Sequence, residues 1–403
     1  MQPNAQAHLL QRLRWCLSRG FWALCSAGLL LGCASAPVSP ASALFADAQF
    51  QPVAGLVIES RHKVFALPAD LQIQLQADAG AQRSTAQRLQ SLVGQLYSET
   101  GGVRLDYSSG HSTGAAQTWA DKRGDCLSLT ILAYSAAQTL GIEAVMQEVP
   151  GPALIDRRGE IDFVNGHVNL LVPTRREVRL GRQLFEPGGF VVDFQPHSAL
   201  RAKGTPLDED AVLARFYNNR ASELLTQGQT DAAYWYYRAA AALDARYAPI
   251  FSNLAQLYLG KGLLVLAESA LRHAIALNGN TDTPLKSLRQ LLLAQGRLAE
   301  AAQLELDLRR WQDSSPYYWL ERGRAELVAG RAVLALAALE QALSLASGFA
   351  ELHYLLALAY ARTQQPELAH AQLETLRTLL GPDPVLARLS RKIQPEPGPA
   401  SHQ

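Results

Sequence analysis

Cys126 stands where a thiol could act as a nucleophile. It follows Gly124 and Asp125 and precedes an apolar segment, residues 127–140, whose aliphatic side chains recur at helical spacing and which ends at Gly141. A sulfur at a helix N-terminus lies near unpaired backbone N–H groups and the positive end of the helix dipole, which favours the thiolate and would stabilise an oxyanion. We expect Asp125 to cap this helix, whereas a carboxylate facing the sulfur would oppose ionisation of the thiol.

His167 and Asp193 could complete such a site. Beyond the helix the apolar pattern becomes alternating, and it predicts strands over residues 142–149, 165–172 and 190–194. The alternation directs His167 and Asp193 away from the buried apolar side chains of their strands. An imidazole can take the proton of a thiol and later give it to a leaving amine, while a carboxylate fixes the imidazole tautomer. The three side chains therefore suit nucleophilic attack on a carbonyl.

Each of these residues also has a structural interpretation. Cys126 could be a core side chain, His167 could be satisfied by its strand neighbours, and Asp193 could serve a turn or an ion pair. Rival acid and base groups are Asp162, His111 and His197, of which the two histidines lie in loop-like sequence.

Three short stretches resemble the transglutaminase-like superfamily of papain-type cysteine hydrolases and acyltransferases. They are Gly-Asp-Cys at 124–126, His-Val-Asn-Leu-Leu-Val at 167–172, and Val-Val-Asp-Phe at 191–194. The resemblance covers residues 64–196 and implies an α+β papain-like fold. It also implies that Cys126, His167 and Asp193 form a catalytic triad of nucleophile, base and orienting acid. The backbone N–H of Cys126 is the expected oxyanion donor, and the sequence identifies no second one.

The N-terminus has the pattern of a bacterial lipoprotein signal. Arg12, Arg14 and Arg19 precede an apolar run that ends in Leu-Leu-Gly-Cys at 30–33. This tetrapeptide resembles a lipobox, which implies cleavage before Cys33 and lipidation of that residue. An ordinary signal peptide cut near residues 34–36 is the alternative. Because Ala34 follows the cysteine, we expect an outer-membrane lipoprotein that faces the periplasm.

The cysteine count limits the thiols that could react in the mature chain, and the net charge bears on its partners. Cys16 and Cys25 would leave with the signal peptide and Cys33 would carry lipid, so Cys126 is the one thiol expected in the mature chain. No Cys-x-x-Cys pair is available for redox work, and we expect no cofactor and no bound metal. The 403 residues carry a net charge of only +1, so we expect no nucleic-acid partner.

The second half of the chain repeats itself every 34 residues. One position of the repeat is occupied by Gly228, Gly262, Gly296, Gly330 and, in the fifth copy, Gln364. Small residues recur at other fixed positions, which lets paired helices approach closely. The period resembles the tetratricopeptide repeat (TPR), with five copies over residues 214–383. The third copy is degenerate, since it carries Arg289 and Glu305 where the others have small or apolar residues. The aromatic run at 234–237 is interpreted as packing within a repeat helix.

These patterns predict an α+β transglutaminase-like domain followed by an all-α TPR solenoid. The expected order is a signal peptide (1–32), a flexible tether (33–53), the cysteine domain (54–205), the TPR array (206–386) and a disordered tail (387–403). The favoured function is a lipid-anchored periplasmic cysteine hydrolase or acyltransferase acting on peptide or amide bonds, whose TPR array recruits a protein or peptide partner. The alternative is a noncatalytic TPR scaffold lipoprotein in which the first domain is a relic.

Overall fold

The structure is a computed structural model that describes most of the chain between residues 41 and 393. The described residues are 41–81, 84, 87, 88, 92, 94, 105–158, 161–173, 178–180, 183–185, 190–194, 204–278, 282–348, 350–380 and 384–393. The predicted signal peptide, the lipidation candidate Cys33 and the rival base His197 lie outside them. Within these ranges, no helix has the length and apolar character needed to cross a membrane.

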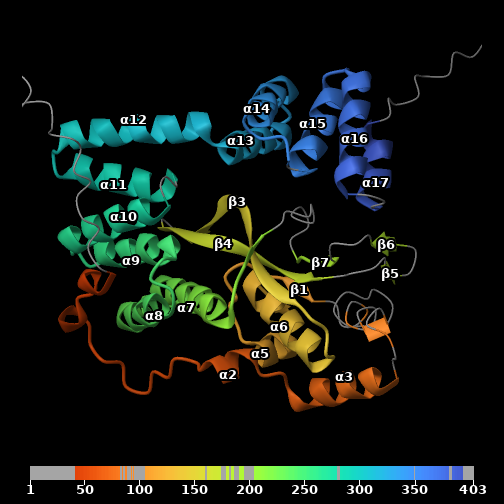
Figure 1. Ribbon diagram of the computed structural model, residues 1–403. Coiled ribbons are helices and arrows are strands. Elements are labelled where there is room, and N and C mark those ends of the chain that lie inside the picture. The colour runs from red at the N-terminus through yellow and green to blue at the C-terminus, as the bar shows by residue number, and fades with distance from the viewer. Residues whose placement is uncertain are drawn as a thin grey trace, which may run out of the picture. The chain divides into compact units, whose positions relative to one another are not determined.

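An antiparallel sheet with a buried helix against it forms the first part of the fold (Figure 1). The strand order is β7-β4-β3-β8, and the strands are β3 (Val145–Arg158), β4 (Ile161–Val172), β7 (Phe190–Val192) and β8 (Thr205–Pro206). Helix α6 (Cys126–Thr139) packs against β4. The shorter elements are α2 (Arg61–Phe65), α3 (Ala69–Ala81), α5 (Ala115–Asp121), the parallel pair β1 (Asp106–Tyr107) and β2 (Arg123–Gly124), and the pair β5 (Val178–Leu180) and β6 (Gln183–Phe185).

The helix prediction around Cys126 matches the structure, whereas the strand boundaries differ. The first strand was predicted to end at residue 149, directly before Pro150-Gly151-Pro152, yet β3 runs on to Arg158. The β3–β4 register shifts between Val149, opposite His167, and Leu154, opposite Asn165. Proline lacks the N–H that the ladder needs, so pairing is interrupted here and resumes beyond the bulge.

Five helix pairs follow the sheet, and they match the predicted repeats (Figure 1). The pairs are α7 (Glu209–Thr226) with α8 (Thr230–Leu243), α9 (Ala248–Gly260) with α10 (Leu264–Asn278), α11 (Asp282–Ala294) with α12 (Leu298–Ser314), α13 (Pro316–Val328) with α14 (Ala332–Leu345), and α15 (Ala350–Arg362) with α16 (Pro366–Leu380). A last helix, α17 (Pro384–Ile393), follows. This helix continues past residue 386, where the array was expected to end and the disordered tail to begin. Its residues Leu389 and Ile393 are buried in the cluster of the last repeats.

The glycine position of the repeat is the left-handed turn that ends the first helix of each pair. Gly228, Gly262, Gly296 and Gly330 have φ between 72° and 76°, and Gln364 adopts the same conformation with φ 60°. At each turn the following N–H bonds the carbonyl five residues back, as Arg331 does with Glu326 and Gln365 with Tyr360. This is the Schellman pattern, for which glycine is the residue of least strain.

The degenerate third repeat replaces apolar packing by an ion pair. Arg289 Nε lies 3.0 Å from Glu305 Oε2, between α11 and α12. In the fourth repeat the same two positions are Gly323 and Leu339, which approach so closely that a Cβ on the glycine would lie 2.5 Å from Leu339. The two charged replacements therefore compensate each other.

The buried apolar side chains form two clusters. The first joins the sheet and α6 to the first three repeats, and the second contains the fourth and fifth repeats with α17. The array is therefore not one continuous core, and its first half shares a core with the cysteine domain.

Residues 41–60, here called the N-terminal strap, pack onto the first two repeats. The strap contains the 3-10 helices η1 (Ala41–Leu44) and η2 (Asp47–Gln49). Phe50 stacks on Tyr234 with ring centroids 3.7 Å apart, Tyr258 donates to the carbonyl of Leu44 (2.7 Å), and Trp235 donates to that of Gln51 (3.0 Å). Residues 41–53 are thus packed where a flexible tether was expected, because Leu44 and Phe50 are buried. Part of the aromatic run at 234–237 serves to hold this strap.

The repeats also bind the sheet through hydrogen bonds. The carboxamide of Asn253, on α9, accepts from the N–H of Val164 (2.9 Å) and donates to its carbonyl (3.0 Å). Asn253 is fully buried, and Val164 belongs to β4. The side chain thus pairs with both polar groups of one strand residue, as a neighbouring strand would. The array is therefore built onto the sheet.

Gln364→Gly should stabilise the protein by about 1 kcal/mol, because a non-glycine residue in the left-handed region is strained. Gly330→Ala, at the same position of the fourth repeat, should cost a similar amount, since no atom lies within 4 Å of its added Cβ and backbone strain alone acts. Urea unfolding followed by circular dichroism measures both. A destabilised Gln364→Gly variant would show that contacts of the glutamine side chain outweigh the strain.

Candidate active site

Cys126 is the first residue of α6 and is 6% exposed. Asp125 caps the helix, as expected, and its carboxylate accepts from the backbone N–H of Ser128 (2.8 Å) and from the Ser128 hydroxyl (2.7 Å). The Ser112 hydroxyl and Asn219, at 3.2 Å, also donate to this carboxylate. Four donors therefore fix the residue that begins the cysteine helix.

The sulfur of Cys126 lies at the edge of β4. The backbone of Val168 hydrogen-bonds to the thiol, and the carbonyl of the same residue accepts from Thr130 Oγ1 (3.2 Å), one turn along α6. The start of α6 is thus docked against the strand residue that directly follows His167. This contact brings the thiol and the imidazole into one region of the fold.

His167 and Asp193 form a buried pair. Nε2 of His167 lies 2.8 Å from Oδ2 of Asp193, and the side chains are 9% and 2% exposed. Nδ1 of His167 is buried and has no hydrogen-bond partner among the described residues. With Nε2–H donating to the carboxylate, the free lone pair lies on Nδ1. The ring is therefore held in the tautomer that can accept a proton at Nδ1.

Two further side chains hold the carboxylate in place. Asn169 Nδ2 donates to Asp193 Oδ2 (2.9 Å), and Gln147 Nε2 donates to Asn169 Oδ1 (2.9 Å). Gln147 Oε1 accepts in turn from the backbone N–H of Gly204 (3.1 Å). Asn169 and Gln147 are each 2% exposed, so the chain of amides is shielded from water. Such a network fixes the position of the acid and, through it, the imidazole.

The repeat array contributes to the same region through α7. Asn219 donates to Asp125, and Glu223 accepts from the backbone N–H of Ser112 at 2.7 Å. Burial raises the pKa of Glu223, although the Ser112 N–H and Arg220 act against it. The loop and cap ahead of Cys126 are therefore braced by the first repeat helix.

Burial raises the pKa of the Cys126 thiol to about 12, and the charge of Asp125 adds to the rise. Hydrogen bonds from the backbone of Val168 and Leu127 act in the opposite direction but do not outweigh burial. This differs from the thiolate expected at a helix N-terminus, because the sulfur is withdrawn from water and desolvation exceeds the dipole effect. The resting residue is a thiol, and attack requires a base.

Of the rival groups, the structure describes the side chain of His111, which is engaged elsewhere. His111 Nε2 bonds Asp121 Oδ2 at 2.8 Å, so its ring is engaged by α5. The side chain of Asp162, like His197, falls outside the part of the chain whose side chains are described. Of the sequence candidates, His167 and Asp193 meet directly, whereas the Cys126 thiol hydrogen-bonds to the backbone of Val168 and not to His167 Nδ1.

The array also brings polar residues to this region that the sequence pattern did not indicate. Asn219 and Asn253 are 34 residues apart and so occupy the same position in the first and second repeats. The later copies have Ser287, Glu321 and Leu355 there. Asparagine at this position in the first two copies alone could have indicated that these two repeats make contacts that the later repeats do not.

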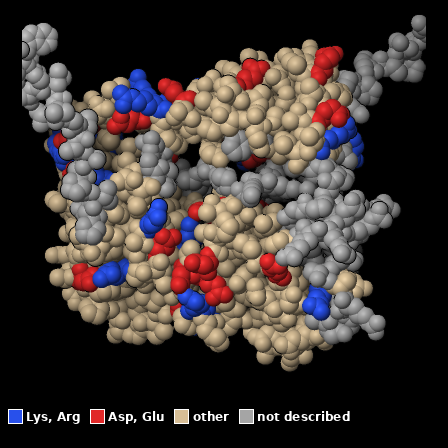
Figure 2. Space-filling model, viewed as in Figure 1, with Lys and Arg blue, Asp and Glu red and all other residues tan. Residues whose placement is uncertain are grey.

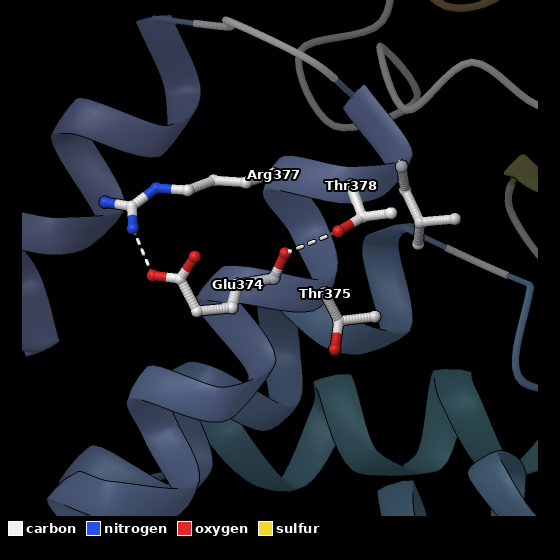
Figure 3. A pocket seen from close by; sticks show the side chains of 5 residues that line it. Glu374, Thr375, Arg377 and Thr378 are labelled. Atoms are coloured by element: carbon white, nitrogen blue, oxygen red, sulfur yellow. Dashed lines mark hydrogen bonds and ion pairs between the residues drawn. The ribbon is translucent and has the colours of Figure 1, made fainter.

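Two further features of the described residues do not form a competing site. The pocket in Figure 3 is lined by Glu374, Thr375, Arg377, Thr378 and Leu379, all on α16. Glu374 pairs with Arg377, and none of the five side chains is buried. On the face shown in Figure 2, acidic and basic side chains are interspersed without a broad basic patch. Within the described ranges, no group of three or more His, Cys, Asp or Glu residues is placed to hold a metal.

Comparisons with known proteins concern the helical repeats. No family model matches the chain, and no curated protein matches it. YrrB, described as a TPR protein with an unusual peptide-binding site, is 20% identical over 44% of this chain and 92% of its own, with a TM-score of 0.24. A thermophilic TPR protein of Thermus thermophilus is 21% identical over 45% of this chain and 98% of its own, with a TM-score of 0.25. Because these TM-scores are low, the TPR-like fold rests on the 34-residue period and the helix pairs.

Proposed function

We propose that the chain is a cysteine hydrolase or acyltransferase in which Cys126 is the nucleophile, His167 the base and Asp193 the acid that orients it. The observation that carries this proposal is the buried hydrogen-bonded pair of His167 and Asp193, in which Nδ1 of His167 has no partner. His167 is the neighbour of Val168, whose backbone hydrogen-bonds to the Cys126 thiol. The transglutaminase-like assignment of the first domain is part of the proposal.

The proton movements follow from the tautomer. Nδ1 of His167 takes the thiol proton as the sulfur attacks a carbonyl carbon, and the resulting imidazolium is stabilised by Asp193. The imidazolium then protonates the leaving amine and leaves an acyl group on Cys126. Water or an amine releases this group, and the two outcomes are hydrolysis and acyl transfer. Amide, peptide and ester carbonyls fit this chemistry.

The first two repeats and the last three have different roles in this proposal. The first two hold β4 and the strap, so we assign recruitment of a protein or peptide partner to the third, fourth and fifth. Exposed large apolar side chains of these repeats support this assignment; they are Leu293, Leu298, Leu306, Val328, Val333, Leu334, Leu345, Leu368 and Leu379. Stacked helix pairs offer such residues an extended binding surface.

The noncatalytic scaffold remains the second candidate, and the 6% exposure of Cys126 favours it. A thiol sealed from substrate would leave only the structural roles of the His167–Asp193 pair. The two candidates predict different behaviour toward an activated ester.

4-Nitrophenyl acetate should acetylate Cys126 in the native protein at neutral pH, with release of 4-nitrophenolate. His167→Ala should slow this reaction by about 10²-fold or more, because the base is lost. Since the pKa of the thiol is raised to about 12, the residual rate of this variant should climb as the pH rises toward that value. Stopped-flow absorbance gives the rate, and mass spectrometry of peptides gives the acetylated residue.

His111→Ala is the matched control, since it removes the other imidazole that bonds a carboxylate at 2.8 Å. It should leave the acetylation rate unchanged. A native protein whose Cys126 stays unmodified until it is denatured would establish the scaffold instead.

We also propose that Cys33 is lipidated and anchors the chain in the outer membrane, facing the periplasm. The lipobox-like sequence at 30–33 supports this. Radiolabelled palmitate should be incorporated by the wild type and lost in Cys33→Ser. Unchanged labelling in that variant would contradict the anchor.

A further inference from the structure

A row of side-chain amides crosses the sheet and ends at Asp193. Gln147 and Asn169 are directly opposite each other in the β3–β4 ladder, and β4 lies between β3 and β7 (Figure 1). Hydrogen bonds of 3.1, 2.9 and 2.9 Å join the members of this row, here called the amide row, in the order Gly204, Gln147, Asn169 and Asp193. His167 lies two positions before Asn169, on the same face of β4, so both side chains reach the same carboxylate.

The hydrogen bonds of the amide row can run in one direction only. A backbone N–H can only donate, so the N–H of Gly204 makes Oε1 of Gln147 an acceptor and leaves Nε2 of that side chain to donate. Oδ1 of Asn169 then accepts from Gln147, and Nδ2 of Asn169 donates to Oδ2 of Asp193. A backbone group thus fixes the orientation of both amides.

This direction decides the role of Asp193. Its Oδ2 accepts from Asn169 Nδ2 at 2.9 Å and lies 2.8 Å from His167 Nε2. If the amide of Asn169 were turned round, its oxygen would face Oδ2 with no hydrogen between them. Because Asn169 donates, the acid stays an acceptor, and the hydrogen shared with His167 belongs to Nε2. The lone pair that could accept the thiol proton is then on Nδ1.

The amide row is closed to water and closely packed. Gln147 and Asn169 are each 2% exposed, as is the side chain of Asp193. A Cβ at Gly204 would lie 2.6 Å from the carbonyl oxygen of Glu148 and 2.9 Å from Cδ of Gln147, so the approach of this N–H requires a glycine. Buried amides are costly unless their hydrogen bonds are made, and here these bonds lead to the acid.

The acid that the amide row holds also acts on the thiol. Burial raises the pKa of Cys126 to about 12, and the charges of Asp125 and Asp193 add to the rise. Asp193 therefore lies close enough to the sulfur for its charge to be felt there. A displaced acid would change the surroundings of both the imidazole and the thiol.

We infer that Asn169 is a positioning residue of the candidate site: by donating to Asp193 it holds the acid against the imidazole, and Gln147 fixes the direction in which it donates. The catalytic meaning of this position rests on the proposed function of Cys126 and His167. Asn169 is not itself a reacting group and acts through Asp193.

Two variants of the full-length protein separate this role from a role in packing. Asn169→Leu removes the donor, so acetylation of Cys126 by 4-nitrophenyl acetate should slow by about 10-fold or more at every pH, the usual effect of losing a hydrogen bond to a charged group. Asn169→Asp places a second carboxyl group against Asp193, and two carboxyl groups at one site retain a shared proton to a higher pH than one group alone. With this proton the new side chain donates to Asp193, and without it the two groups repel each other. The rate of Asn169→Asp, relative to the wild type at the same pH, should therefore be close to one near neutral pH and fall to that of Asn169→Leu as the pH rises.

The Nε2–H of His167 reports the same contact without any reaction. In protein with isotope-labelled histidine, this hydrogen should give a nuclear magnetic resonance signal protected from exchange with water, and His167→Ala identifies the signal by its loss. The signal should be lost in Asn169→Leu. In Asn169→Asp it should be present near neutral pH and disappear at a pH where the wild type retains it.

Gln372→Glu is the matched control. It makes an amide-to-acid change beside another buried imidazole, since Oε1 of Gln372 lies 2.6 Å from Nδ1 of His353 in the fifth repeat. It should change neither the acetylation rate nor the signal of His167.

Each outcome decides the inference. Wild-type behaviour of Asn169→Leu overturns it, and so does an Asn169→Asp variant that matches Asn169→Leu at every pH. A wild-type thiol inert to the ester overturns the proposed function, and the His167 signal alone then decides whether Asn169 holds the acid. Should Asn169→Leu fold poorly, as circular dichroism would show, Asn169→Asp is compared with itself across the pH range. A rate and a signal that keep a constant ratio to the wild type would then overturn the inference.

Discussion

The edge of β4 is the constraint on which the rest of the structure depends. β7 pairs only with Leu170, Leu171 and Val172, so the strand residues before them must find other partners for their buried polar groups. Asn253 meets Val164, Tyr247 meets Gly166, and the start of α6 meets Val168. An unpaired backbone group at such a place would cost about 1–3 kcal/mol. Helices of the repeat array and the cysteine helix are therefore held in one row by a single strand.

This arrangement gives the first repeats a structural role in the cysteine domain. In a simple two-domain protein, the array would be an adaptor joined to an enzyme by a linker. Here α7 braces Asp125 through Asn219, and the residue before α9 reaches the strand that carries His167. The first half of the array and the cysteine domain share one buried cluster, whereas the fourth and fifth repeats form another. The first repeats thus belong to the candidate site, whereas the fourth and fifth have a buried cluster of their own.

Much of this could be predicted from local sequence. The apolar period and the Gly-Asp lead gave the cysteine helix and its cap, and strand alternation gave the facing of His167. The 34-residue period also identified the recurrent glycine position, with Gln364 in the fifth copy, which the structure shows to be a left-handed turn. These features depend on residues close in sequence or on a repeated pattern.

The remainder depends on contacts between residues far apart in the chain. Nothing near Tyr247 indicates that its hydroxyl meets Gly166, which is 81 positions away. The pKa of Cys126 depends on how deeply the sulfur is buried, which the helix pattern does not give, so the expected thiolate was wrong in direction. Leu44 and Phe50 looked like isolated apolar residues in an Ala- and Pro-rich tether, and only the aromatic surface of α8 and α9 gives them a place to pack.

The contacts along β4 should make the cysteine domain and the first two repeats one cooperative unit. Native-state hydrogen exchange of Asn253→Leu tests it most directly, with Ser287→Ala, at the same position of the third repeat, as the control. We expect faster exchange in β4 and α6 as well as in α9, and no such change in the control. Faster exchange confined to α9, with β4 and α6 as protected as in the wild type, would contradict it.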